Sequence, residues 1–340
     1  MLSLSRRNLL TRSLAVAALC PVRTFAQHEK SVFMVLWRGE TEVEAGFRAH
    51  FEERGLPVNI TVRSLDRDIG RLPSIIAEIS EVDPDIVYSW GTSVTLGLAG
   101  RDPDLMEGPD DFPPQILDRP IVFTMVSQPI KSRIIKRFGP TGRNVTGVSH
   151  LVPLEAQLEA MRAYMPVDRI AVIFTPSELN SVLAVEKLTE AGQHLNIRID
   201  QYPVPLDTAG QPDPASLPIL VASVAASGPQ FLYLGPDSFL GQYAQEITDI
   251  ANSYRLPSFA SVEHMLSASD ALYGLVAPYQ KVGRFTATKA ERILFDDADP
   301  SEVPVELLPE FSYRIRSDVA RELGIFPRLA LLDYAVIVEP

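Results

Sequence analysis

The chain has 340 residues, of which 31 are lysine or arginine and 43 are aspartate or glutamate, so its formal net charge at pH 7 is −12. Such an acidic surface repels nucleic acid and anionic lipid headgroups, which argues against both as partners. The length exceeds what one hydrophobic core usually serves and therefore predicts two domains. The single cysteine, Cys20, excludes a disulfide within one copy of the chain.

Residues 1–26 are typical of an export signal. Paired arginines, Arg6 and Arg7, precede an apolar run over 13–22, and Ala26 offers a small residue for cleavage. The arginine pair resembles the start of a twin-arginine signal. We therefore expect a periplasmic protein whose signal is cleaved near Ala26.

Two observations argue against a membrane anchor. The apolar run of the signal is shorter than the roughly 20 residues that span a bilayer, and no later segment is long and apolar enough to do so. Leu19 stands where a lipid-attachment site needs a small residue, so we do not expect a lipid on Cys20.

After the signal, short apolar segments alternate with amphipathic ones. Strands are predicted at 31–37, 57–65, 85–90 and 120–126, and helices near 42–55 and 72–82. The strands are apolar almost throughout rather than alternating with polar residues. Such strands, separated by helices, predict a parallel sheet that is covered on both faces.

The same alternation restarts at Leu154, which opens a helical stripe of apolar residues. Strands are then predicted at 169–174, 197–204, 230–235, 256–262 and 271–279, and helices at 178–195 and from Phe239. Two runs of about five units predict two doubly wound α/β lobes. We place the first lobe at 30–150 together with 278–330, the second at 151–277, and a C-terminal tail at 331–340.

The ends of the strands are where a ligand site is expected, because open parallel sheets bind ligands outside the carboxyl ends of their strands. The residues that directly follow the predicted strands are mostly small, hydroxylated or hydrogen-bonding. They include Arg38, Gly91-Thr92, Ser127-Gln128, Ser149-His150, Glu178, Asp237 and Glu263. Some of these residue types also favour helix N-caps in any protein, so Thr92 and Asp237 have a purely structural alternative.

The two tryptophans of the chain, Trp37 and Trp90, both fall at predicted strand ends. A tryptophan usually packs in a core, but this shared edge makes each a candidate for lining a pocket. Arg38, beside the first of them, is a candidate partner for a ligand carboxylate, with an ordinary surface arginine as the alternative.

Several segments resemble one known family. "DIVYSWGTSVTLGL", "RPIVFTMVSQPI", "NVTGVS", "RIAVIFTPSELNS" and "SDVARELGI" are similar to segments of the ABC-transporter substrate-binding protein family that includes tryptophan- and tyrosine-type binding proteins. The resemblance covers nearly all of the chain after the signal. It implies a type I periplasmic-binding fold, in which two Rossmann-like lobes close on a ligand about a hinge. We expect no cofactor, no metal and no catalysis, because the motifs for them are missing from the sequence.

The resemblance also implies which positions contact the ligand. Together with the strand-end residues, they give these candidates: Trp37, Arg38, Trp90, Gly91, Thr92, Ser127, Gln128, Ser149, Glu178, Asn180, Ser181, Asp237 and Glu263.

One candidate departs from the family pattern. Members commonly have Ser-Asp-Pro where this chain has Ser127-Gln128-Pro129. An aspartate there suits a ligand ammonium, whereas a glutamine is neutral, and losing a charge-assisted hydrogen bond weakens binding by about 1.5–3 kcal/mol. Either another carboxylate receives the ammonium, with Glu178, Asp237 and Glu263 as candidates, or the ligand is not an α-amino acid.

An acidic, proline-rich segment at 100–119 is a second departure, and we expect a solvated surface loop there, with a lip over the cleft or a docking surface as alternatives. We find no sequence motif of a hydrolase, a phosphate-binding loop or a metal site. The five histidines show no ligand spacing, and only His150 lies near a strand end.

These observations predict a solute-binding protein that delivers a small organic ligand to an inner-membrane ABC permease and acts as a monomer. A periplasmic sensor of the same fold, acting on a membrane kinase, is the alternative. An exported hydrolase is a third and weaker one. The expected ligand has a planar or apolar part and a polar or anionic end.

Overall fold

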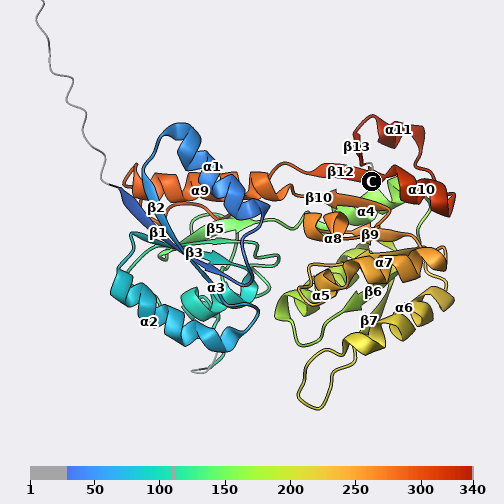
Figure 1. Cartoon of the computed structure of the whole chain (residues 1–340), viewed down its shortest axis with the longest axis horizontal. Helices are drawn as coiled ribbons and strands as arrows, with labels where there is room; N and C mark the ends of the chain where they lie inside the picture. The colour runs from blue at the N-terminus through green and yellow to red at the C-terminus, as the bar shows by residue number, and fades with distance from the viewer. Residues whose placement is uncertain (1–28, 109–111, 339–340) are drawn as a thin grey trace, which may run out of the picture.

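The computed structural model describes residues 29–108 and 112–338. They form two α/β lobes that lie side by side (Figure 1). The first lobe contains a six-stranded sheet in the order β11-β5-β4-β3-β1-β2, in which every pair of neighbours is parallel. The second contains a seven-stranded sheet in the order β13-β12-β10-β9-β8-β6-β7. The predicted fold class, two doubly wound α/β lobes, is confirmed.

The elements of the first lobe up to the first crossing are β1 (Lys30–Leu36), α1 (Glu42–Arg54), β2 (Val58–Ser64), α2 (Leu72–Val82), β3 (Ile86–Trp90), α3 (Thr92–Ala99), β4 (Ile121–Thr124) and β5 (Val145–Ser149). The second lobe continues with α4 (Leu154–Tyr164), β6 (Arg169–Phe174), α5 (Leu179–Leu195), β7 (Arg198–Pro203), α6 (Leu217–Ala226), β8 (Phe231–Leu234), α7 (Ala244–Ser253), β9 (Ser258–Ala260), α8 (Glu263–Ser267) and β10 (Tyr273–Val276). The last third of the chain adds α9 (Tyr279–Leu294), β11 (Glu306–Leu307), β12 (Ser312–Arg316), α10 (Ser317–Leu323), α11 (Leu329–Leu332) and β13 (Ala335–Val338).

The central strands are buried over their whole length, as their apolar sequences require. Every residue of β3, β4, β5, β8 and β10 is buried. Helices cover both faces of each sheet, so these strands have no polar face to present to water. Their carboxyl ends therefore remain the natural positions for polar side chains.

The chain crosses between the lobes three times. It leaves the first lobe between β5 and α4, returns between β10 and α9, and leaves again between β11 and β12. Helix α9 packs on α1, and β11 pairs with β5, so both belong to the first lobe (Figure 1).

The third crossing corrects the sequence analysis, which assigned all of 278–330 to the first lobe. Strand β12 pairs antiparallel with β10 in the second sheet, and β13 pairs with β12. The segment from Ser312 onwards, including the predicted tail, therefore belongs to the second lobe. That part of the predicted division is wrong because a strand's partner is decided by long-range pairing.

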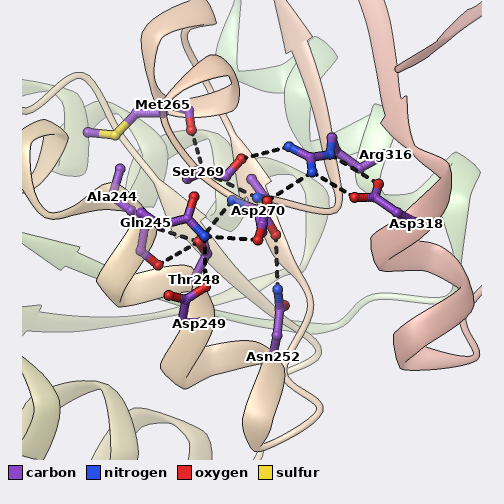
Figure 2. Close-up of polar contacts among 11 residues, drawn as sticks. Ala244, Gln245, Thr248, Asp249, Asn252, Met265, Ser269, Asp270, Arg316 and Asp318 are labelled. Atoms are coloured by element: carbon purple, nitrogen blue, oxygen red, sulfur yellow. Dashed lines mark hydrogen bonds and ion pairs between the residues drawn. The ribbon is translucent and has the colours of Figure 1, made fainter. Parts of the chain in front are cut away.

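A polar network holds this returning segment in place (Figure 2). The guanidinium of Arg316, at the end of β12, forms ion pairs with Asp270 at 2.9 Å and Asp318 at 2.6 Å, and donates to the carbonyl of Ser269 at 3.2 Å. Asn252, on α7, donates to the carbonyl of Asp270 at 3.0 Å. The network thus joins α7, the α8–β10 loop and the β12–α10 junction.

Candidate functional site

A pocket lies between the lobes at the carboxyl ends of their strands. Its lining combines residues that follow β1, β3, β4 and β5 of the first lobe with residues that follow β6, β8 and β9 of the second. Nine of the thirteen candidate residues line it: Trp37, Arg38, Trp90, Gly91, Thr92, Ser127, Glu178, Asn180 and Asp237. The two lobes therefore each supply part of one site.

On the first lobe, an arginine lies over a tryptophan. The guanidinium carbon of Arg38 is 5.1 Å from the centre of the Trp90 ring, a cation–π arrangement. Among the described residues, the Arg38 Nε and the Trp90 Nε1 are both buried without a hydrogen-bond partner. Burial lowers the pKa of Arg38, which is the direction expected for a cation removed from water. Among the described residues no carboxylate forms an ion pair with Arg38, so this half of the pocket presents a positive charge that Glu44 and Glu178 offset only from a distance.

Next to this pair, the chain turns sharply into α3. Gly91 has a φ of 88°, which L side chains rarely adopt, and its N–H donates to the carbonyl of Thr124 at 2.9 Å. Thr92 and Ser93, in the first turn of α3, line the pocket. Because the first amides of a helix have no partner inside it, this turn favours an anionic ligand group.

Two further polar atoms without partners lie at the ends of β4 and β5. The Ser127 Oγ and the His150 Nδ1 are buried, line the pocket and have no hydrogen-bond partner among the described residues. The His150 ring packs edge-on against Tyr279 with centroids 6.4 Å apart. Burial lowers the pKa of His150 to about 3, so its ring is neutral at physiological pH.

On the second lobe, two carboxylates face the pocket. Asp237 is almost fully satisfied: it accepts hydrogen bonds from the Thr175 N–H at 2.8 Å, the Ser181 Oγ at 2.7 Å and the Leu240 N–H at 2.7 Å. Glu178 accepts from two successive amides, those of Ser238 at 2.8 Å and Phe239 at 2.7 Å. These hydrogen bonds, most of them from backbone amides, fix the orientation of both carboxylates.

The acidic pair forms no ion pair with another described residue. Neither Glu178 nor Asp237 forms an ion pair with a lysine, arginine or histidine in the part of the chain that the structure describes. Burial, and then the charge of Asp237, raises the pKa of Glu178 to about 7, and burial raises that of Asp237. A ligand cation would relieve this repulsion, since an opposite charge favours the ionised form of a carboxyl.

Comparison with known proteins identifies the family. The sequence profile described as "ABC transporter substrate binding protein" matches residues 112–338. The chain belongs to this family. Its members bind solutes outside the cytoplasm and are not enzymes.

The individual proteins that resemble this chain share less than a quarter of its residues in the aligned parts. A "Tyrosine-binding protein" of Clostridioides difficile is 23% identical over 289 residues, covering 84% of this chain and 77% of that protein. A conserved domain protein from Vibrio cholerae superposes with a TM-score of 0.77 at 20% identity, over 92% of this chain and 99% of that one. An ABC domain in complex with L-Trp from Streptococcus pneumonia superposes with a TM-score of 0.75 at 20% identity, over 90% of this chain and 99% of that one. At these identities the structural matches establish the fold.

Four of the candidate residues of this chain do not line the pocket. Ser149 donates to the carbonyl of Val126 at 2.9 Å, and Ser181 donates to Asp237, so both support the residues that do line it. Gln128 also lies outside the lining. Its backbone carbonyl accepts the Ser132 N–H at 2.9 Å, within the loop that follows β4.

Glu263, the fourth, binds across two of the crossings between the lobes. One carboxylate oxygen accepts the N–H of Tyr279, at the start of α9, and the other lies 2.8 Å from the guanidinium of Arg314 on β12. Glu263 therefore joins the second and third crossings instead of facing the ligand site.

Sequence reasoning missed other lining residues. Met125, His264, Met265 and Tyr279 all line the pocket. His264 and Met265 follow the candidate Glu263 directly, and Tyr279 is the third residue after β10. Met125 and Tyr279 fall inside the strands predicted at 120–126 and 271–279, which extend past the observed ends of β4 and β10, and His264 and Met265 lie beyond the residues that directly follow β9.

Two other sequence expectations concern regions away from this pocket. The export signal, Cys20 and the cleavage near Ala26 lie outside the described residues. No helix within 29–108 and 112–338 is long and apolar enough to cross a membrane. The described part of the 100–119 segment does not line the pocket; Phe112, Pro113 and Gln115 instead border a hollow beside α2 and α3.

Proposed function

We propose that this protein binds an α-amino acid between its lobes and delivers it to an ABC importer in the inner membrane. One observation carries the ligand class. Among the described residues, neither the guanidinium of Arg38 on the first lobe nor the acidic pair of Glu178 and Asp237 on the second forms an ion pair. A ligand with a carboxylate and an ammonium neutralises both charges at once.

The arrangement also supports coupling between binding and closure. The carboxylate of the ligand meets Arg38 and the first turn of α3, while its ammonium meets Glu178 across the cleft. Because each lobe supplies one charge, only a closed cleft satisfies both ends and removes them from water. The names of two relatives, a tyrosine-binding protein and an L-Trp complex, make aromatic amino acids the first ligands to test.

An amino acid ligand does not require an aspartate at the position of Gln128. The aspartate that many family members have at that position is absent here, but Glu178 supplies a carboxylate from the other lobe. A neutral residue at position 128 is thus compatible with an amino acid ligand.

A fluorescence titration tests the ligand class directly. The only two tryptophans of the chain, Trp37 and Trp90, both line the pocket, so their emission reports its occupancy without a label. We expect L-tyrosine or another L-amino acid to bind, and the analogues lacking the ammonium or the carboxylate to bind at least about tenfold more weakly. Equal binding of tyramine and tyrosine would refute the role of Arg38.

Mass spectrometry of ligand released from the purified protein gives an independent answer. If a permease and an ATPase are encoded beside this gene, transport is tested by reconstituting the protein with them and measuring ATP-dependent uptake of the same amino acid. Binding without uptake, together with activation of a neighbouring membrane kinase, would favour the sensor.

A further inference from the structure

Outside the pocket, an ion pair joins the two lobes. Lys131 belongs to the loop that follows β4 in the first lobe, and Glu190 lies on α5 in the second. The Lys131 Nζ donates to the Glu190 Oε1 at 2.5 Å, and Lys187 of the same helix binds the other oxygen at 3.1 Å. The pair is partly open to water, with side-chain exposures of 36% and 42%. It is therefore sensitive to salt.

The first residue of α5 makes a second contact with the first lobe. Leu179 packs against the apolar cluster of that lobe, which contains Val94, Phe123 and Ile134. Leu179 and Glu190 are 11 residues apart, or about 16 Å along a helix. Helix α5 thus contacts the opposite lobe at two well-separated points.

Both segments that make this contact are rigid. In the loop after β4, the Ser132 N–H donates to the Gln128 carbonyl at 2.9 Å and the Ile134 N–H to the Pro129 carbonyl at 3.1 Å. Ile134 is fully buried in the core of the first lobe. Helix α5 is 17 residues long and ends in a left-handed cap at Asn196. The lobes therefore cannot separate while these contacts persist.

The same two segments carry pocket residues. Ser127 precedes Lys131 by four residues, and Glu178 and Asn180 flank Leu179 on either side. Holding α5 against the first lobe therefore also holds Glu178 opposite Arg38.

We propose that Lys131, Leu179 and Glu190 form an inter-lobe contact that favours the closed cleft and positions the acidic pair over the pocket. Opening the cleft separates the ion pair and exposes Leu179 to water. The contribution of one exposed pair is small, so its loss changes the ratio of closed to open protein by about two- to fivefold. The proposal goes beyond the ligand class and holds whatever ligand is bound.

Distance measurements between spin labels test this contact without a ligand. The mature chain expected after cleavage has no cysteine, so a pair introduced by Val82→Cys on α2 and Ile219→Cys on α6 is unique. Both positions are exposed and lie on opposite lobes. A closed cleft should give a shorter distance between the two labels than an open cleft. At low salt we expect part of the unliganded protein to show the shorter distance, and Lys131→Glu should shift this population toward the longer distance.

The reversed pair distinguishes the ion pair from a general charge effect. Adding Glu190→Lys to Lys131→Glu restores an attraction across the cleft and should recover the short separation. Lys136→Glu is the matched control, because Lys136 lies in the same loop but pairs with Asp104 within the first lobe. High salt should reduce the difference between the parent and Lys131→Glu.

Three results would overturn the proposal: a parent with only the long separation, identical distributions in the parent and Lys131→Glu, or equal shifts in Lys131→Glu and Lys136→Glu. Because no ligand is present, none of these outcomes depends on whether the proposed amino acid binds.

Discussion

The guanidinium of Arg38 lies 5.1 Å from the centre of the Trp90 ring, and its Nε has no hydrogen-bond partner in the described part of the chain. The cation–π contact stabilises the arginine only in part, because a buried cation also needs hydrogen-bond acceptors. The pocket therefore keeps a positive charge that a ligand carboxylate can neutralise. If a ligand carboxylate binds there, as proposed, Arg38 serves binding and lowers the stability of the unliganded protein.

Replacing Arg38 should separate binding from stability. In Arg38→Met we expect the affinity for the bound amino acid to fall by about 10- to 100-fold, the effect of losing a charged hydrogen bond. The unliganded protein should melt at the same temperature or higher, because a buried charge without partners has been removed. Calorimetry measures the first quantity and thermal unfolding the second.

Arg67→Met provides the control for this experiment. Arg67 is an exposed arginine near Arg38, outside the pocket lining. The Arg67→Met substitution should leave the affinity for the ligand within about twofold of the parent value, as expected for a screened surface charge. An equal loss in both variants would mean that the pocket responds to net charge and not to a specific contact.

The raised pKa of Glu178 predicts how stability depends on pH. Its usual value is 4.5 and burial, followed by repulsion from Asp237, raises it to about 7 in the folded protein. Between these values the folded state binds more protons than the unfolded state, so the stability that this group contributes is complete below pH 4.5 and is lost as the pH rises through 7. The unliganded parent should lose more stability than Glu178→Gln over this interval.

Ligand binding should reverse the protonation of Glu178. A ligand ammonium favours the carboxylate, so binding at pH 7 should release protons and become tighter as the pH rises through 7. Calorimetry in two buffers of different ionisation enthalpy measures the protons released. Glu178→Gln should release fewer and bind more weakly, and a release equal to that of the parent would contradict the assignment.

The strand-end rule predicted much of the pocket lining because parallel strands of one sheet end at the same edge. It found Arg38, Trp90 and Glu178 without any knowledge of how the lobes face each other. It did not give the direction in which a side chain points, so Ser149 and Ser181 proved to support the lining residues from behind. Tyr279 was missed because the crossing from β10 to α9 brings it to the pocket.

The sequence pattern predicted the first boundary between the lobes but not the last one. The restart of the strand–helix alternation at Leu154 coincides with the first crossing. The segment Ser312–Arg316 has no local signal for its partner, because either sheet offers an edge to a short strand. Its place beside β10 depends on antiparallel pairing and on ion pairs of Arg316 with Asp270 and Asp318.

The position of Gln128 leads to a further prediction. Because Gln128 does not line the pocket, Gln128→Ala and Gln128→Asp should both bind the amino acid within about twofold of the parent. Ser127→Ala, at the neighbouring position that does line it, should weaken binding by about 2- to 12-fold, the effect of one neutral hydrogen bond. Titration of all three variants by tryptophan fluorescence compares them under one condition. Strong binding that appears only in Gln128→Asp would restore the importance of this glutamine.

The contact between α1 and α9 depends on two glycines. A Cβ added at Gly283 would lie 1.8 Å from the Val43 carbonyl oxygen, and one at Gly46 would lie 2.1 Å from that of Gln280. Both obstacles are backbone atoms, which cannot move without shifting a helix. The helices therefore pack closely enough that only glycine fits, and α9 is held on the first lobe after the chain has returned from the second.

Gly283→Ala should destabilise the first lobe by about 1–3 kcal/mol, the typical cost of overpacking. Alanine favours a helix over glycine by about 1 kcal/mol, which opposes this effect, so a net loss identifies the close contact as its cause. Urea unfolding followed by tryptophan fluorescence reports the first lobe alone, because Trp37 and Trp90 both belong to it, whereas circular dichroism reports both lobes. In Gly39→Ala the added carbon has no atom within 4 Å, so this control should unfold like the parent. If Gly283→Ala unfolds at the parental urea concentration or above it, α1 and α9 can move apart without a penalty, and the close contact does not hold α9 in place.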